Sequence, residues 1–135
     1  MKKIFFLLFT IVLLVGCQSK PVSGTDVSVA GGSYKNVEPK ELNSMLKNKD
    51  FVLINVHIPF AGDIAKTDLS VPYDQIEQNL SQLPADKDAK ILLYCRSGHM
   101  SQIAAEKLVS LGYTNIWNLK GGMNDWEQAG FDLEK

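Results

Sequence analysis

Cysteine is scarce in this sequence, which holds only two, Cys17 and Cys95, among its 135 residues. Two cysteines form one disulfide at most, so the chain is not a small domain held together by a disulfide framework. The two histidines, His57 and His99, show no metal-ligand spacing with these cysteines. We therefore expect no metal site and no cofactor.

The sequence also lacks an excess of charge of either sign. Fourteen basic residues stand against 15 acidic ones, which gives a formal net charge of −1. A nucleic-acid binder would show a basic stripe, so we expect no nucleic-acid partner. With 45% hydrophobic and 21% charged residues, the composition is that of a folded domain and excludes a disordered chain.

An apolar stretch long enough to cross a membrane is missing as well. The twelve largely apolar residues from Ile4 to Val15 would span about 18 Å as a helix, against roughly 30 Å for the hydrocarbon core of a bilayer. Preceded by Lys2 and Lys3, this stretch has the size and charge of an export signal.

The end of this signal resembles the lipobox of bacterial lipoproteins, in Leu14-Val15-Gly16-Cys17. In that motif the cysteine is lipidated and becomes the new N-terminus. The resemblance implies a signal peptide over residues 1–16 and a lipid on Cys17 that holds the chain to a membrane of the bacterial cell envelope, on its extracytoplasmic face. The alternative is an ordinary signal peptide that ends near a cysteine.

The residues after Cys17 predict a tether. From Gln18 to Ser33 the chain has Ser, Gly, Thr and Pro but no Leu, Ile, Phe or Trp, so it has little to bury. We expect residues 17–33 to be the lipidated cysteine and a flexible tether, and residues 34–135 to be one folded domain.

Within that domain, the hydrophobic pattern alternates between the periods of strands and helices. Strands are predicted at residues 51–56, 70–72, 91–94 and 115–119, and helices from residue 39 and over 76–83, 101–111 and 123–129. Such alternation predicts an α/β fold, a parallel sheet with helices on both faces. We expect Trp117 and Trp126 to lie in its core.

Cys95 is the residue best placed for chemistry. It directly follows the buried strand predicted at 91–94 and precedes a helix, and ligands of open parallel sheets bind at such strand ends. The intervening loop can turn its N–H groups inward, and the helix N-terminus adds partial positive charge that stabilises a thiolate. The candidate anion-binding residues are Arg96, Ser97, Gly98, His99, Met100 and Ser101. The alternatives are that Cys95 is a small buried hydrophobe and His99 a solvated side chain.

Three separated motifs resemble single-domain rhodanese-like sulfurtransferases. Residues 94–101, Tyr-Cys-Arg-Ser-Gly-His-Met-Ser, are similar to the active-site loop of that family, and residues 118–123 with Trp126 to its Gly-Gly signature. Residues 53–57, Leu-Ile-Asn-Val-His, stand where the family usually has an Asp-Val-Arg strand end. The resemblance covers residues 34–131. It implies a rhodanese-like fold with a five-stranded, mostly parallel sheet, and a persulfide on Cys95.

The resemblance implies a sulfurtransferase that moves sulfane sulfur from thiosulfate or a polysulfide to a thiol or cyanide-like acceptor. We expect it to work as a monomer. Three departures bear on the donor: Met100 stands where the family often has arginine, and Asn55 and His57 replace the usual acid and base.

Two other functions stay open. One is a tethered module without catalysis, which binds a small anion or delivers sulfur to a single protein partner. The other is a cysteine-dependent phosphatase, whose loop needs an arginine at the sixth position after the cysteine to grip phosphate. Ser101 occupies that position, which makes the phosphatase the weaker alternative.

Overall fold

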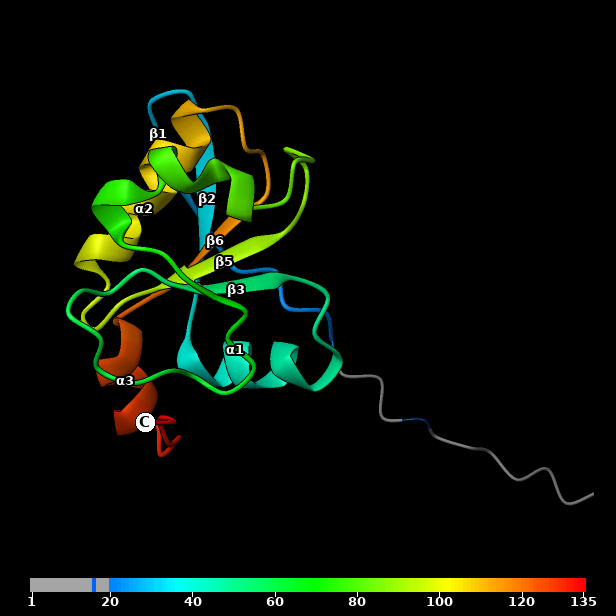
Figure 1. Ribbon diagram of the computed structural model, residues 1–135. Coiled ribbons are helices and arrows are strands. Elements are labelled where there is room, and N and C mark those ends of the chain that lie inside the picture. Colours follow the sequence, from blue (N-terminus) through cyan, green and yellow to red (C-terminus); the bar gives the residue numbers. More distant parts are fainter. Residues whose placement is uncertain (1–15, 17–19) are drawn as a thin grey trace, which may run out of the picture.

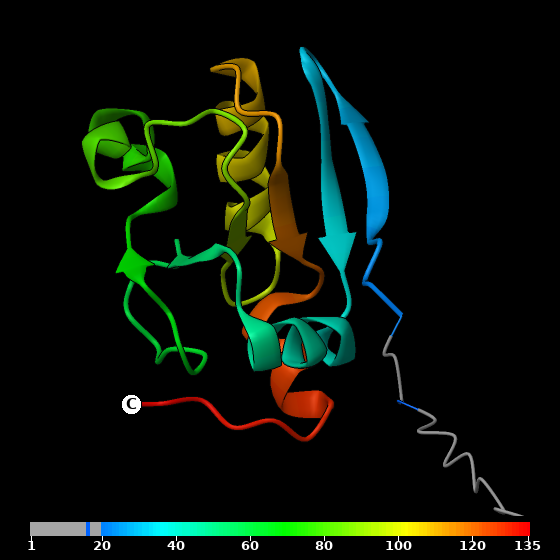
Figure 2. The same ribbon diagram turned by 90° about the vertical axis from the view of Figure 1, so that its right-hand side faces the viewer.

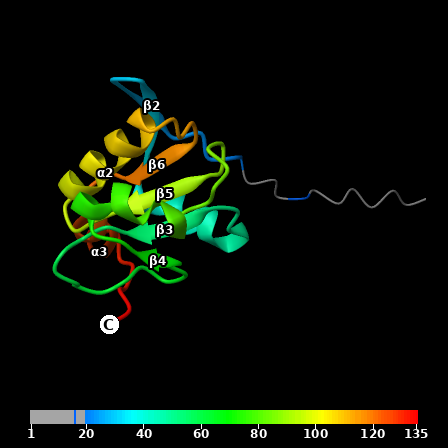
Figure 3. The same cartoon turned by 45° about the horizontal axis from the view of Figure 1, so that its top comes forward.

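The computed structural model describes residue 16 and residues 20–135, so the expected lipidation site, Cys17, lies outside the described residues. A six-stranded sheet with the order β1-β2-β6-β5-β3-β4 forms the centre of the molecule (Figure 3). The first two strands pair antiparallel and all other neighbours pair parallel. The strands are β1 (Thr25–Val29), β2 (Gly32–Val37), β3 (Val52–Asn55), β4 (Leu69–Ser70), β5 (Ile91–Tyr94) and β6 (Ile116–Leu119).

The prediction of a tether up to Ser33 is wrong over residues 25–33, and this accounts for a sixth strand where five were expected. β1 and β2 form a hairpin at one side of the sheet, with Val29 opposite Gly32 (Figure 2). Val27 and Val29 pack against the core, and these two small side chains are enough because β1 is an edge strand with only one face to bury.

Helices cover both faces of the sheet, as predicted (Figure 1). One face carries α2 (His99–Ser110) and two 3₁₀ segments, η2 (Tyr73–Gln75) and η3 (Glu77–Gln82). The other face carries α1 (Pro39–Met45), η1 (Leu46–Asn48) and α3 (Gly122–Gln128). Among the described residues, no helix has both the length and the apolar character needed to span a bilayer.

The strand β5 is the centre of the core, and all four of its residues are buried. Ile91 and Leu93 face α2, while Leu92 and Tyr94 face α1 and α3. A strand buried on both faces reads as a continuous apolar run, which is why it was predicted with the bounds that the structure has. Trp117 and Trp126 are buried as expected, at 6% and 3% exposure.

The helices differ from the predictions at their ends and in one case in type. α2 begins at His99, two residues before its predicted start, and Gly112 follows it with a φ of +93°. The helix predicted over 76–83 is instead the 3₁₀ segment η3, because the backbone at Asn79 leaves the helical region. Pro39 is the first residue of α1, as predicted.

A buried tyrosine ties the loop between β3 and β4 to β5. The hydroxyl of Tyr94 accepts a hydrogen bond from the Ile64 N–H at 3.0 Å and donates one to a carboxylate oxygen of Asp63 at 3.1 Å. It also lies 2.8 Å from the hydroxyl of Thr67. The pKa of Tyr94 is raised, mainly by burial, so the phenol stays neutral. The network joins residues 63–67 to Tyr94 and fixes the loop that follows β3.

Replacing Tyr94 with phenylalanine tests how much this network stabilises the fold. Tyr94→Phe leaves the buried Ile64 N–H without its acceptor, so we expect the free energy of unfolding to fall by about 1–3 kcal/mol. Urea unfolding measures it. The control is Tyr73→Phe, because Tyr73 packs at the edge of the core and its hydroxyl makes no hydrogen bond within residues 20–135. Equal loss in both variants would show that the network adds nothing.

Candidate active site

Cys95 directly follows β5, at the edge of the sheet where the parallel strands end. Strands β3 and β6 flank β5, so the loop that begins at Cys95 is supported on both sides. The side chain is only 1% exposed and belongs to the core cluster on the α2 face. Burial alone is also typical of a cysteine that only packs in the core. Whether Cys95 is a packing residue or a nucleophile therefore depends on the groups around its sulfur.

The loop after Cys95 closes over the sulfur with polar groups. The Gly98 N–H donates a hydrogen bond to Sγ of Cys95 at 3.0 Å, and the Ser101 hydroxyl lies 3.5 Å from the same sulfur and 3.1 Å from the Gly98 carbonyl. Gly98 has a φ of +98°, which a residue with a side chain adopts only with strain, and this turn aims its N–H at the sulfur. A packing cysteine needs no such donors.

The first turn of α2 adds to this environment. Because α2 begins at His99, the N–H groups of its first residues have no partner within the helix and carry partial positive charge. The helix starts directly after Gly98, and its first turn includes Ser101. Both residues contact the Cys95 sulfur. The loop therefore offers backbone and hydroxyl donors to negative charge on or near Sγ.

Residues 121–124 hold this loop from the other side. The Met123 N–H donates to the Cys95 carbonyl and the Asn124 N–H to the Arg96 carbonyl, both at 2.9 Å. The backbones meet so closely that a Cβ on Gly122 would lie 2.3 Å from the Cys95 carbonyl oxygen. Gly122 also has a φ of +58°. Glycine at this position is therefore required by both space and backbone conformation.

The end of β3 borders the loop. The amide nitrogen of Asn55 donates to the Gly62 carbonyl at 3.0 Å and to Asp63 at 2.8 Å, and its oxygen accepts the His57 N–H at 3.0 Å. Asn55 thus positions the chain after β3 and presents no charge to a substrate. Sequence reasoning noted the residue as a departure from a family pattern and missed this structural role.

His57 is half-buried, and its Nδ1 has no hydrogen-bond partner among the described residues. Burial is the main cause that lowers the pKa of His57, and the positive charge of Arg96 lowers it further. Both effects disfavour the imidazolium, so His57 adds no fixed positive charge at neutral pH.

The side chains of the other predicted loop residues make no hydrogen bond to the sulfur within residues 20–135. Arg96, Ser97 and His99 are exposed, and no hydrogen bond or ion pair of their side chains occurs within residues 20–135. The side chain of Arg96 lines a hollow of about 280 Å³ beside the loop, together with Ala61, Met123, Glu127, Leu133 and Lys135. Met100 is half-buried and packs against the core cluster that contains Cys95.

No group of three or more histidine, cysteine, aspartate or glutamate side chains that could hold a metal occurs in the part of the chain that the structure describes. The buried sulfur of Cys95 lies next to two hydrogen-bond donors, the Gly98 N–H and the Ser101 hydroxyl.

Comparison with known proteins places this geometry among relatives. The pattern of the rhodanese-like domain family matches residues 38–129. The chain is 29% identical over 100 residues to a sulfurtransferase of Allochromatium vinosum, covering 72% of this chain and 92% of that protein. It is 35% identical over 100 residues to the adenylyltransferase and sulfurtransferase UBA4 of Candida albicans, covering 67% of this chain and only 23% of that longer protein.

A solved structure is similar over the same region. The crystal structure of a rhodanese-related protein from Thermoplasma volcanium matches with a TM-score of 0.63 and 26% identity, covering 74% of this chain and 97% of the other. The likeness confirms the expected α/β arrangement around a mostly parallel sheet.

A variant at Gly122 tests whether the 121–124 segment holds the loop. We expect Gly122→Ala to displace the Cys95 carbonyl and shift the amide resonance of Gly98, because the added Cβ would overlap the loop backbone. Two-dimensional NMR of the amides measures this displacement. The matched control is Gly112→Ala, where φ is also positive but nothing lies within 4 Å of the added Cβ. A Gly98 resonance that stays in place in folded Gly122→Ala would refute the supporting role.

Proposed function

Because the chain belongs to the rhodanese-like domain family, we propose that it is a sulfurtransferase that carries sulfane sulfur as a persulfide on Cys95. The family relationship and the rhodanese-like fold come from the match over residues 38–129 and from the similar solved structure. The observation that carries the proposal is the hydrogen bond from the Gly98 N–H to Sγ of Cys95 inside a closed loop. A donor at that position stabilises negative charge on sulfur.

The reaction proceeds in two displacements. The Cys95 thiolate attacks the outer sulfur of the donor and forms a new S–S bond, while the donor's own bond to that sulfur breaks and its electron pair leaves with the remainder. With thiosulfate the leaving group is sulfite, and with a polysulfide it is a shorter polysulfide. A thiolate or cyanide then attacks the outer sulfur of the persulfide and regenerates the Cys95 thiolate.

The loop supports both steps through charge stabilisation. Negative charge rests on Sγ in the thiolate and on the outer sulfur in the persulfide, and the N–H of Gly98 and the hydroxyl of Ser101 lie next to Sγ. Because the donors are held by the helix start and by residues 121–124, they need little rearrangement as the charge moves. Arg96 contributes the nearest permanent positive charge in the loop, and we assign it to the capture of anionic donors.

Met100 argues for a donor whose charge lies on soft sulfur atoms rather than on sulfonate oxygens. It packs against the core and brings no cation to the loop, and His57 is neutral at its border. A soft thioether suits a polysulfide chain better than the thiosulfate dianion. The substrate class we propose is therefore a polysulfide or similar sulfane sulfur, with thiosulfate a poor donor.

We also propose that the chain is a lipoprotein held on the extracytoplasmic face of a bacterial membrane. The support is the sequence before the folded domain, with Lys2 and Lys3, the apolar run of residues 4–15 and the box that ends at Cys17. Several acyl chains on one cysteine hold a protein stably, whereas a single chain does so only marginally.

The central experiment is the intact mass of the purified full chain after incubation with a polysulfide. We expect the gain of one sulfur atom, its removal by reductant, and no gain in Cys95→Ser. The control is Cys17→Ala, which removes the other cysteine and should still accept sulfur on Cys95. If several sulfane donors leave the mass of the parent unchanged, the proposal fails and a binding module without catalysis takes its place.

A second prediction concerns Met100. A hydrogen bond to a charged group is worth about 1.5–3 kcal/mol, so Met100→Arg should lower the KM for thiosulfate by about tenfold to a hundredfold. Steady-state kinetics with cyanide as acceptor, run on thiosulfate and on a polysulfide, measure the change. Met100→Leu is the control, since it keeps the packing without the charge. Equal thiosulfate efficiency in parent and Met100→Arg, both folded, would leave Met100 as a packing residue only.

A third prediction concerns Cys17. The parent should fractionate with membranes, and Cys17→Ala should be released or stay unprocessed, because the residue that takes the lipid is gone. Fractionation followed by mass analysis of the N-terminal peptide distinguishes these states. Parent and Cys17→Ala with the same distribution and the same N-terminal mass would contradict the lipoprotein proposal.

A further inference from the structure

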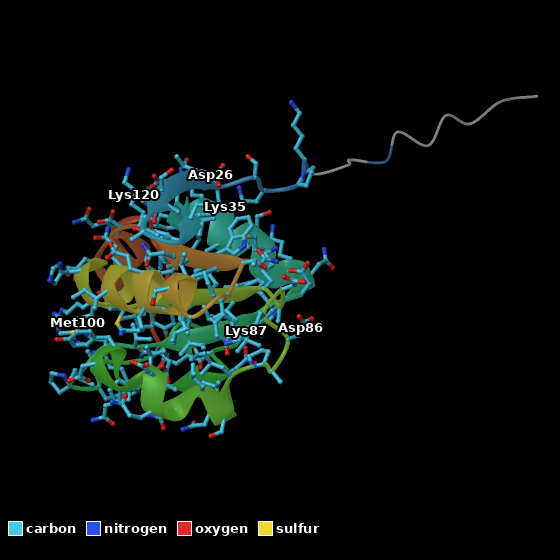
Figure 4. The ribbon with its side chains drawn as sticks, turned by 90° about the horizontal axis from the view of Figure 1, so that it is seen from above. Asp26, Lys35, Asp86, Lys87, Met100 and Lys120 are labelled. Atoms are coloured by element: carbon cyan, nitrogen blue, oxygen red, sulfur yellow. The ribbon has the colours of Figure 1, made fainter. Side chains whose placement is uncertain are left out.

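The described chain begins at one edge of the sheet and the candidate active site lies at the other. The amino edge, where the parallel strands begin, includes Asp50 before β3 and Lys90 before β5. The carboxyl edge, where they end, includes Cys95 and its loop. In Figure 4, Asp86 and Lys87, which precede β5, lie on one side of the molecule and Met100 lies on the opposite side.

Residues 20–22 are packed against the amino edge. Lys20, Pro21 and Val22 line a hollow of about 220 Å³ together with Ser44, Met45, Asn48, Asp50 and Lys90. Val22 also packs against the core cluster on the α1 face. Gly24 lies so close to the indole of Trp117 that an added Cβ would be 2.9 Å from a ring carbon. The chain therefore leaves the domain at a fixed place on this edge.

The covalent chain limits where Cys17 can be. Lys20 is the third residue after Cys17, and even fully extended a chain of three residues reaches about 11 Å at most. The nucleophile lies at the far end of β5, because Lys90 and Cys95 are five residues apart along an extended strand, about 16 Å. A lipid on Cys17 would thus hold the amino edge near the membrane and leave the Cys95 loop further from it.

The amino edge presents exposed charged side chains of both signs, which include Lys47, Asp50, Asp86, Lys87 and Asp88. Large hydrophobic side chains that are exposed occur at only two places within residues 20–135, Phe60 and Ile103. Phe60 follows β3 at the carboxyl edge, and Ile103 lies in the first half of α2, which starts at that edge. The exposed apolar side chains therefore lie on the side of the active-site loop and not at the amino edge.

We propose that the lipid-anchored chain stands on the amino edge of its sheet, so that the Cys95 loop faces away from the membrane and passes sulfur to a thiol in the aqueous phase. This inference rests on the proposed sulfurtransferase function and on the lipid at Cys17. The acceptor is then a water-soluble thiol and not a sulfur acceptor within the membrane. The transfer is a thiolate attack on the outer sulfur of the Cys95 persulfide, which gives the acceptor persulfide and frees the Cys95 thiolate.

The orientation is tested on the full-length, lipidated chain in phosphatidylcholine–phosphatidylglycerol vesicles that contain a lipid with a nitroxide on its headgroup. A fluorophore is attached through Asp50→Cys at the amino edge or through His99→Cys at the carboxyl edge, each combined with Cys95→Ser. Because a nitroxide quenches only at short range, we expect several-fold stronger quenching at position 50 than at position 99. Equal quenching, stronger quenching at position 99, or a chain that does not remain with the vesicles would overturn the proposal.

The acceptor is tested on the parent chain loaded with sulfur on the same vesicles. Glutathione in solution should discharge the persulfide as fast on vesicles as in detergent, and a lipid that carries a thiol on its headgroup should discharge it several-fold more slowly. Faster discharge by the lipid thiol would overturn the proposal. The quenching measurement needs no persulfide. A chain that never accepts sulfur would therefore contradict the proposed function, while the quenching would still measure the orientation.

Discussion

The carbonyl oxygens of Cys95 and Arg96 both accept hydrogen bonds from N–H groups at the start of α3, and the loop geometry depends on this contact. With the carbonyls turned toward residues 123 and 124, the loop is free to turn the N–H of Gly98 toward the Cys95 sulfur. The contact is possible because Gly122 has no side chain to separate the two backbones. Two segments more than 20 residues apart thus form one support for a single sulfur atom.

The charge that this site offers comes mainly from the backbone. His57 is held neutral by burial and by Arg96, Asn55 is used to position the chain after β3, and Met100 packs against the core. Side-chain cations would bind a dianion strongly, and that binding would weaken as the salt concentration rises. Oriented N–H groups instead act on charge at the sulfur itself. A site built in this way is suited to holding charge on sulfur and less suited to capturing the sulfonate oxygens of thiosulfate.

Continuous apolar runs and helix-end signals predicted the parts that position the nucleophile. The strand Ile91–Tyr94 was predicted with its true bounds, and placing Cys95 at its carboxyl end followed from the general behaviour of parallel sheets. Gly98 and Ser101 were named as loop residues, and the structure brings both to the sulfur.

The parts that were not predicted depend on contacts between distant residues. The hairpin at residues 25–37 was missed because its strand β1 buries only Val27 and Val29, which a search for large apolar residues passes over. The role of Asn55 depends on Gly62 and Asp63, and the need for glycine at position 122 depends on the Cys95 carbonyl. Such requirements arise from packing between segments and leave no periodic signal within one segment.

The central claim is that the loop stabilises negative charge on the Cys95 sulfur through the N–H of Gly98. The most direct measurement follows the amide resonances of the full chain by NMR while the Cys95 thiol is converted to the thiolate by raising the pH. The account predicts that the Gly98 amide proton moves downfield as the thiolate forms, since its hydrogen bond then meets a negatively charged sulfur. A Gly98 amide that does not respond while the thiolate forms in full would contradict it.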